Sequence, residues 1–156
     1  MRCDFVGHPV VTDEQASAED AQAFRAEHGI DDAPLALVLP GSRKSEVSRL
    51  APIFGEALAP VLKARPDLRL VIPAAAPVEH LVRDAIKDWP VAPLVIRSED
   101  KALKRAAFKA ADVALAASGT VSLELAAAGT PMVIAYDMNW LSRQIIGRML
   151  KVDTVT

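Results

Sequence analysis

The sequence predicts an α/β domain: a three-layer, Rossmann-like parallel sheet with helices on both faces. Short apolar segments of strand length alternate with segments of about ten residues that have helical periodicity, as in chains built from strand–helix–strand units. Apolar residues make up 51% of the chain and aromatic residues only 4%, so the core consists mainly of Ala, Val and Leu, which suits close packing of helices on a sheet. At 156 residues, the chain has the length of one domain with a substantial core.

Five segments have the compact apolar composition of buried parallel strands. They are residues 35–39, 68–73, 91–96, 112–116 and 132–135. The third contains Pro93, which cannot donate a backbone hydrogen bond, so its regular part is expected to be short.

A helix is expected before the first strand. Thr12 and Gln15 have the spacing of a capping box, so this helix should begin at Thr12 and run to about His28. Gly29 then supplies the left-handed position after the helix, and Ile30 the apolar residue beyond it.

The later helices lie between the strands. After the first strand, helical periodicity runs from Val47 to Val61, and Pro52 predicts a break or a fresh start within it. The other expected helices are residues 78–88, 101–109, 121–128 and 139–151, of which the second is basic.

The chain is expected to comprise a connector, residues 1–11, which leads into one domain, residues 12–156. In the connector, Cys3 and His8 have no partner at metal-ligand spacing, so both are expected to be packing residues. A single cysteine excludes an internal disulfide and fits a reducing compartment.

Charge and hydropathy exclude two classes of function. The net charge is −2 with both signs interspersed, so the basic footprint of a nucleic-acid-binding protein is missing. The longest apolar segment, residues 121–136, is interrupted by Glu124, Gly129 and Pro131, and does not reach transmembrane length. The sequence therefore predicts a soluble or at most peripheral protein.

Two polar, glycine-containing turns follow the first and fourth predicted strands. They contain Gly41, Ser42 and Arg43 in the first turn and Ser118, Gly119 and Thr120 in the second. In the usual doubly wound order, strands one and four are neighbours that flank the switch point, where ligands bind. The two turns should therefore face one crevice.

The chemistry of the two turns fits a nucleoside diphosphate. Arg43 offers a planar guanidinium that can bind two phosphate oxygens, and the helix after Thr120 offers unpaired backbone N–H groups to an anion. Glu124, one turn into that helix, could accept both hydroxyls of a ribose. The simpler alternative is that Ser118 or Thr120 only caps the helix, and that Glu124 adds a favourable charge near its start.

Several other site types are not indicated. The chain contains no Walker A loop, no G-x-G-x-x-G and no G-x-S-x-G elbow at Ser118. It has neither a metal-ligand cluster nor a Cys/His nucleophile pair, so we expect no metal and no cofactor.

Four motifs occur in order along the chain. They are Phe5-Val6-Gly7-His8-Pro9, Leu39-Pro40-Gly41-Ser42-Arg43 with Glu46, Ala117-Ser118-Gly119-Thr120 with Glu124, and Pro131-Met132-Val133 followed by Tyr136. Their order and spacing, from about Cys3 to the last residue, resemble those of the lipid-A-disaccharide synthase family. The combination is specific, whereas any one motif alone is a weak signal.

The resemblance implies an inverting, metal-independent glycosyltransferase of the two-Rossmann GT-B type. The family joins UDP-2,3-diacylglucosamine to 2,3-diacylglucosamine 1-phosphate and releases UDP. This chain would be the C-terminal, UDP-sugar-binding half, with the acceptor-binding half before Cys3 and a further segment after Thr156. The general base is expected on the other half, so the fragment alone should be inactive.

Positions within the motifs imply the site residues. The UDP-binding residues would be Gly41, Ser42, Arg43, Ser118, Gly119, Thr120 and Glu124. Arg43 would also have a catalytic role, stabilising the departing UDP. Asp137 departs from the family pattern, since many relatives carry a basic residue there, and it is left out of the site.

The resemblance also implies the partners and the location. Expected partners are a UDP-diacylglucosamine donor, an acylated glucosamine 1-phosphate acceptor, a membrane surface and a second copy in a homodimer, but no nucleic acid. The expected location is the bacterial cytoplasm, including a peripheral position on the inner membrane. Residues 139–151 would form an amphipathic helix, either packed on protein or, as Trp140 and the cationic face suggest, on a membrane surface.

Two alternatives stay open. A UDP-N-acetylglucosamine 2-epimerase or the peptidoglycan GlcNAc transferase would share a Ser/Gly turn and a ribose carboxylate, although the motifs at residues 5–9 and 40–43 argue against both. The other alternative is a non-catalytic module that senses nucleotides in the same crevice.

Overall fold

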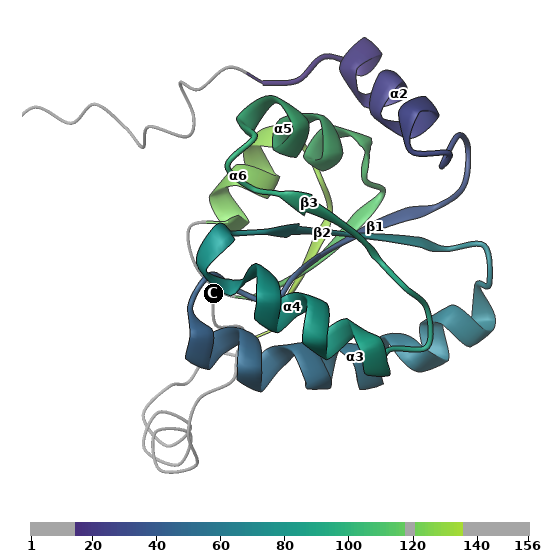
Figure 1. Ribbon diagram of the computed structural model, residues 1–156. Helices are drawn as coiled ribbons and strands as arrows, with labels where there is room; N and C mark the ends of the chain where they lie inside the picture. The colour runs from purple at the N-terminus through teal and green to yellow at the C-terminus, as the bar shows by residue number, and fades with distance from the viewer. Residues whose placement is uncertain (1–14, 118–120, 136–156) are drawn as a thin grey trace, which may run out of the picture.

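The computed structural model describes residues 15–117 and 121–135 (Figure 1). Four sequence predictions lie outside these described residues: the connector at 1–11, the turn at 118–120, the departure at Asp137 and the amphipathic helix at 139–151.

Five parallel strands form one sheet in the order β3-β2-β1-β4-β5. Their bounds are β1 (Leu35–Leu39), β2 (Arg69–Ala74), β3 (Leu94–Arg97), β4 (Val113–Ala117) and β5 (Met132–Ala135). In the register, Leu37 of β1 lies opposite Val71 of β2 and Ala114 of β4. The parallel sheet is confirmed, and so is the prediction that the first and fourth strands are neighbours. The third strand begins only after Pro93, so its regular part is short, as we expected from this proline.

The helices form a layer on each face of the sheet (Figure 1). Their bounds are α2 (Ala18–Glu27), α3 (Lys44–Ala64), α4 (Glu79–Ala85), α5 (Lys101–Ala110) and α6 (Val121–Ala128), with single 3-10 turns η1 (Ala76–Val78) and η2 (Ile86–Asp88) flanking α4. Ala36 and Val38 of β1 pack in the core under α3 and α4, whereas Leu35, Leu37 and Leu39 pack in the core shared with α2, α5 and α6. This alternation across a buried strand produces the predicted three layers.

Helix α2 starts later than predicted. The capping box is formed by Ser17 and Asp20: the Ser17 hydroxyl accepts a hydrogen bond from the Asp20 N–H (3.1 Å), and the Asp20 carboxylate accepts one from the Ser17 N–H (2.9 Å). Gln15 precedes the helix, so the predicted start at Thr12 with Gln15 as its capping partner is wrong. Ser17 and Asp20 have the same three-residue spacing, which the sequence analysis did not single out.

The predicted end of α2 is confirmed. Gly29 has φ +66°, and the Ile30 N–H donates to the Arg25 carbonyl (2.8 Å), as in a Schellman motif. Ile30 is buried, so the residue after the glycine anchors the chain on its way to β1.

Helix α3 runs through Pro52 and Pro60 without interruption, so the predicted break at Pro52 is wrong. Both prolines lie on the exposed face, where water can satisfy the carbonyls that lose a donor. The opposite face buries a row at helical spacing that includes Val47, Leu50, Phe54, Leu58 and Leu62. This burial holds both parts of the helix on the sheet. Val61, which the periodicity had placed on the apolar face, is 45% exposed.

Candidate functional site

A cavity of about 400 Å³ lies beyond the carboxyl ends of the central strands. Its walls come from the β1–α3 loop, the ends of β2 and β4, the residues after β3, and helices α5 and α6. The lining residues are Leu39, Gly41, Ser42, Arg43, Glu46, Pro73, Ala75, Ser98, Lys104, Ala117, Val121 and Glu124. The cavity is therefore at the switch point of the sheet, where open α/β folds bind ligands.

The structure brings together the two groups of candidate residues that it describes. Gly41, Ser42 and Arg43 from the first turn and Glu124 from α6 line this single cavity. Ser118, Gly119 and Thr120 lie outside the described residues, but Ala117 and Val121 on either side of them also line the cavity.

The β1–α3 loop has a conformation that requires glycine. Gly41 has φ +113°, and a Cβ placed there would overlap the Glu46 side chain. The Glu46 Oε1 accepts a hydrogen bond from the Ser42 N–H (3.1 Å), so the first turn of α3 folds back onto the loop. Glu46, which the sequence marked only as a motif residue, thus holds the loop in shape.

Arg43 is the N-cap residue of α3, with extended backbone (φ −104°, ψ 145°) and an exposed side chain. Among the described residues, we observe no ion pair and no hydrogen bond to the Arg43 guanidinium. The group is therefore available to an anion in the cavity, and its planar fork suits a phosphate.

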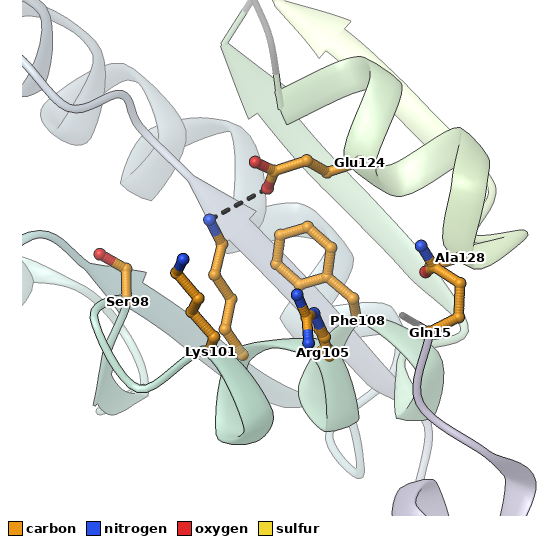
Figure 2. A pocket seen from close by; sticks show the side chains of 8 residues that line it. Gln15, Ser98, Lys101, Arg105, Phe108, Glu124 and Ala128 are labelled. Atoms are coloured by element: carbon orange, nitrogen blue, oxygen red, sulfur yellow. Dashed lines mark ion pairs between the residues drawn. The ribbon is translucent and has the colours of Figure 1, made fainter. Parts of the chain in front are cut away.

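Glu124 forms an ion pair with Lys104 of α5, with 3.0 Å between Nζ and Oε2 (Figure 2). The two side chains are 30% and 26% exposed, respectively. The Lys104 Nζ also lies 5.5 Å from the centroid of the Phe108 ring, one turn further along α5. The sequence placed Lys104 on a basic helix and did not assign it to the site. Its spacing from Phe108 puts both residues on one side of α5 but gives no indication of the pairing with Glu124, which lies on another helix.

A second cavity of about 300 Å³ adjoins the first. It shares Ser98, Lys104 and Glu124 with the first cavity and is also lined by Lys101 and Arg105 (Figure 2). Three cationic groups and one carboxylate on this wall give a positive local potential, which favours an anionic ligand.

Glu99 lies next to the shared wall. Its Oε1 accepts a hydrogen bond from the backbone N–H of Ala76 (2.7 Å). Because this bond favours the ionised form, it holds the pKa of Glu99 below its ordinary value. The contact ties the segment after β3 to the turn after β2, both of which border the first cavity.

Residues 15–117 and 121–135 contain neither of two further site types. These residues contain no cluster of three or more His, Cys, Asp or Glu side chains able to hold a metal ion. None of their helices is long and apolar enough to cross a membrane.

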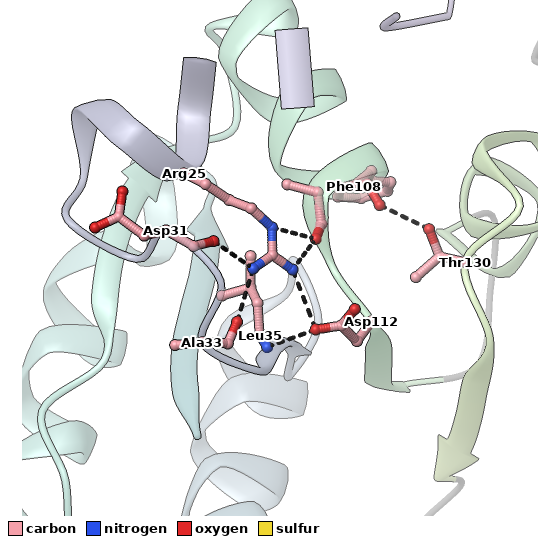
Figure 3. A network of polar contacts seen from close by, with 8 residues as sticks. Arg25, Asp31, Ala33, Leu35, Phe108, Asp112 and Thr130 are labelled. Atoms are coloured by element: carbon pink, nitrogen blue, oxygen red, sulfur yellow. Dashed lines mark hydrogen bonds and ion pairs between the residues drawn. The ribbon is translucent and has the colours of Figure 1, made fainter. Parts of the chain in front are cut away.

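At the amino ends of the central strands, opposite the cavity, lies a polar network centred on Arg25 of α2 (Figure 3). Its guanidinium donates to the carbonyls of Ala110 (2.6 Å), Ala33 (2.7 Å) and Asp31 (2.9 Å), and to the Asp112 carboxylate (3.1 Å). Asp112 Oδ2 also accepts from the Leu35 N–H (2.9 Å), at the start of β1. This network joins the beginnings of β1 and β4 to α2, away from the cavity, so its role is structural.

Solved structures share this fold. A glycosyl transferase family 9 protein from Veillonella parvula superimposes with a TM-score of 0.61 at 12% identity, covering 90% of this chain and 46% of the other. UDP-GlcNAc 2-epimerase from Neisseria meningitidis, solved bound to UDP-GlcNAc, gives a TM-score of 0.60 at 16% identity, covering 86% and 37%. The predicted fold class is confirmed: the chain has a three-layer, Rossmann-like α/β fold with a parallel sheet, which it shares with these structures.

Sequence comparison identifies the family to which the chain belongs. A family model described as lipid-A-disaccharide synthetase matches residues 1–156, and the chain belongs to this family. Lipid-A-disaccharide synthase from Ruegeria pomeroyi is 55% identical over 162 residues, which cover 100% of this chain and 40% of that protein. The synthase from Rhodospirillum centenum is 46% identical over 156 residues, covering 99% and 38%. The chain thus spans about 40% of the length of the curated relatives that it matches.

Proposed function

We propose that this chain is the donor-binding part of a lipid-A-disaccharide synthase. In the whole protein, it would hold UDP-2,3-diacylglucosamine while the sugar is transferred to 2,3-diacylglucosamine 1-phosphate, giving lipid A disaccharide 1-phosphate and UDP. Family membership supports the reaction class and favours it over the epimerase-like and peptidoglycan-transferase alternatives. The proposed organisation is a connector at residues 1–11 and a UDP-sugar-binding domain at 12–156.

One observation carries the proposal: Arg43 and Glu124, from elements 81 positions apart in the chain, line the same cavity at the switch point. The Arg43 guanidinium binds the diphosphate, and the Glu124 carboxylate accepts the ribose hydroxyls. Residues 118–120 complete the phosphate site through the N-terminus of α6. The cavity volume of about 400 Å³ lies in the range of small-molecule sites.

Arg43 would also act in the chemical step. As the bond between the sugar and UDP breaks, negative charge grows on the departing diphosphate, and a guanidinium fixed beside it stabilises that charge. A base that accepts the proton of the acceptor hydroxyl is expected on the rest of the protein, so this chain should bind UDP without turning over substrate. The acceptor, a membrane surface and a second copy of the protein are the proposed partners. The proposed location is the bacterial cytoplasm, including the face of the inner membrane.

Calorimetric titration of UDP into the chain tests this assignment. Arg43→Ala removes charge-assisted hydrogen bonds worth about 1.5–3 kcal/mol, so the Kd for UDP should rise about 10- to 100-fold. Glu124→Ala should weaken UDP and uridine alike, whereas Arg43→Ala should weaken UDP selectively, since uridine has no phosphates.

The matched control is Arg65→Ala. Arg65 caps the far end of α3 and pairs with Asp67 at 3.4 Å, with both side chains largely exposed and neither lining the first cavity. The Arg65→Ala variant should bind UDP with the Kd of the unmutated chain. An unchanged Kd in both Arg43→Ala and Glu124→Ala would overturn the proposed site.

A further inference from the structure

Lys104 stands at the wall shared by the two cavities. It lines both of them, and it forms the ion pair with the carboxylate that is proposed to hold the ribose. The sequence motifs do not include this residue, so its place in the site comes from the structure alone.

The Lys104 side chain is fixed from several directions. Its helix is N-capped by the Asp100 carboxylate, which accepts from the Leu103 N–H (3.1 Å), and the same helix buries Ala107 and Phe108 in the core. The ammonium lies over the Phe108 ring and against Glu124 Oε2, and the side chain is 26% exposed. Ordering the Lys104 ammonium therefore costs less conformational entropy than ordering that of a fully exposed lysine, because packing already restricts the side-chain stem.

The charges around the first cavity bear on the role of Lys104. Two carboxylates, Glu46 and Glu124, line a cavity proposed to receive a diphosphate. Glu46 is engaged by the Ser42 N–H, and Glu124 is engaged by Lys104. Without the ammonium, the Glu124 carboxylate would repel the incoming phosphates, and no other described residue is seen to hold its orientation.

We propose that Lys104 is a positioning residue for the donor nucleotide. By pairing with Oε2, it holds the Glu124 carboxylate in the orientation that accepts the ribose hydroxyls. Its positive charge also reduces the repulsion between that carboxylate and the diphosphate. The inference rests on the proposed function, because it assigns Lys104 a role that acts through Glu124. Direct contact between Lys104 and the nucleotide is the competing explanation.

A double-mutant cycle on UDP binding separates these explanations. The variants are Lys104→Met, Glu124→Gln and the two combined, titrated with UDP by calorimetry. Met keeps the apolar stem over Phe108 and removes only the charge. If Lys104 acts through Glu124, Lys104→Met should raise the Kd about tenfold in the parent chain and less than twofold in the Glu124→Gln background. Lys104→Arg, which can still pair with the carboxylate, should restore most of the affinity.

The matched control is Lys109→Met, which makes the same charge change on the same helix. Lys109 is exposed and lines neither cavity, so its substitution should leave the Kd unchanged. Circular dichroism of each variant checks that the fold is retained, and Lys104→Gln replaces Lys104→Met if the latter unfolds.

Each outcome has a defined meaning. Equal losses in both backgrounds would show that Lys104 contacts the nucleotide itself and would overturn the inference, as would an unchanged Kd in Lys104→Met. Failure of the proposed function looks different: the parent chain would not bind UDP, or Arg43→Ala would bind it as well as the parent.

Discussion

Replacing Arg25 with Met should lower the free energy of unfolding by about 2–3 kcal/mol. The guanidinium satisfies the part-buried carbonyls of Ala110 and Ala33, and losing a charge-assisted donor to each costs about 1–1.5 kcal/mol. The remaining contacts, to Asp31 and Asp112, are exposed and add little, because water replaces the donor there. Met fills much of the same volume, so a cavity contributes little to the loss.

Urea denaturation followed by circular dichroism measures this loss, with an unchanged m-value as the sign that the folded state has kept its compactness. For a chain of this size, 2–3 kcal/mol corresponds to a fall in Tm of roughly 4–12 °C. Arg65→Met is the comparison, because the Arg65–Asp67 pair has side chains that are 63% and 57% exposed. Its substitution should cost less than about 0.5 kcal/mol.

A loss in Arg25→Met no larger than that in Arg65→Met would refute the reasoning, since it would mean that water satisfies the carbonyls as well as the guanidinium does. The affinity for UDP gives an independent check. The network joins the beginnings of β1 and β4, whereas the cavity lies beyond their ends, so folded Arg25→Met should bind UDP with the parent Kd.

Three more substitutions have defined outcomes. Gly41→Ala forces a side chain into a left-handed conformation against Glu46, at about 1–3 kcal/mol of strain, so calorimetry should show UDP binding weakened about tenfold or more. Thr130→Val removes a buried hydrogen bond to the Phe108 carbonyl (2.7 Å) and should lower the free energy of unfolding by about 1–2 kcal/mol in urea denaturation; no loss would mean that this carbonyl needs no donor. Because the pKa of Glu99 is lowered in the folded state, its stabilisation is present above the ordinary value of 4.5 and is lost as pH falls through the folded value. Glu99→Gln should therefore flatten the decline of stability below pH 4.5, and NMR titration of the parent should place the Glu99 midpoint below 4.5.

The sequence predicted the sheet well because its signals are local and the topology rules are strict. Strand β1 was predicted at its observed bounds, since five consecutive apolar residues in a parallel sheet leave little choice. The adjacency of β1 and β4, on which the site depends, followed from the usual strand order, and the structure confirms it.

Errors arose where a local signal competed with another local signal or with packing. The helix was predicted to start at Thr12 but is capped at Ser17, because capping patterns are short and common, and spacing alone does not show which of them caps a helix. Pro52 predicted a break that did not occur, because its ring faces solvent while Phe54 and its neighbours hold the helix on the sheet. Lys104 was missed because its partner, Glu124, lies on another helix, and pairing between elements leaves no periodic trace in the sequence.

The prolines of α3 bear on how firmly the β1–α3 loop is held. Pro52 removes the hydrogen bond to the Ser48 carbonyl, so the helix resists bending least just after its first two turns. Those turns are tied to the loop through Glu46 and Ser42. Because Val47 and Leu50 in these turns are also buried on the sheet, the missing hydrogen bond leaves the loop anchored to the core, so a ligand meets Arg43 on a backbone that is already held in place.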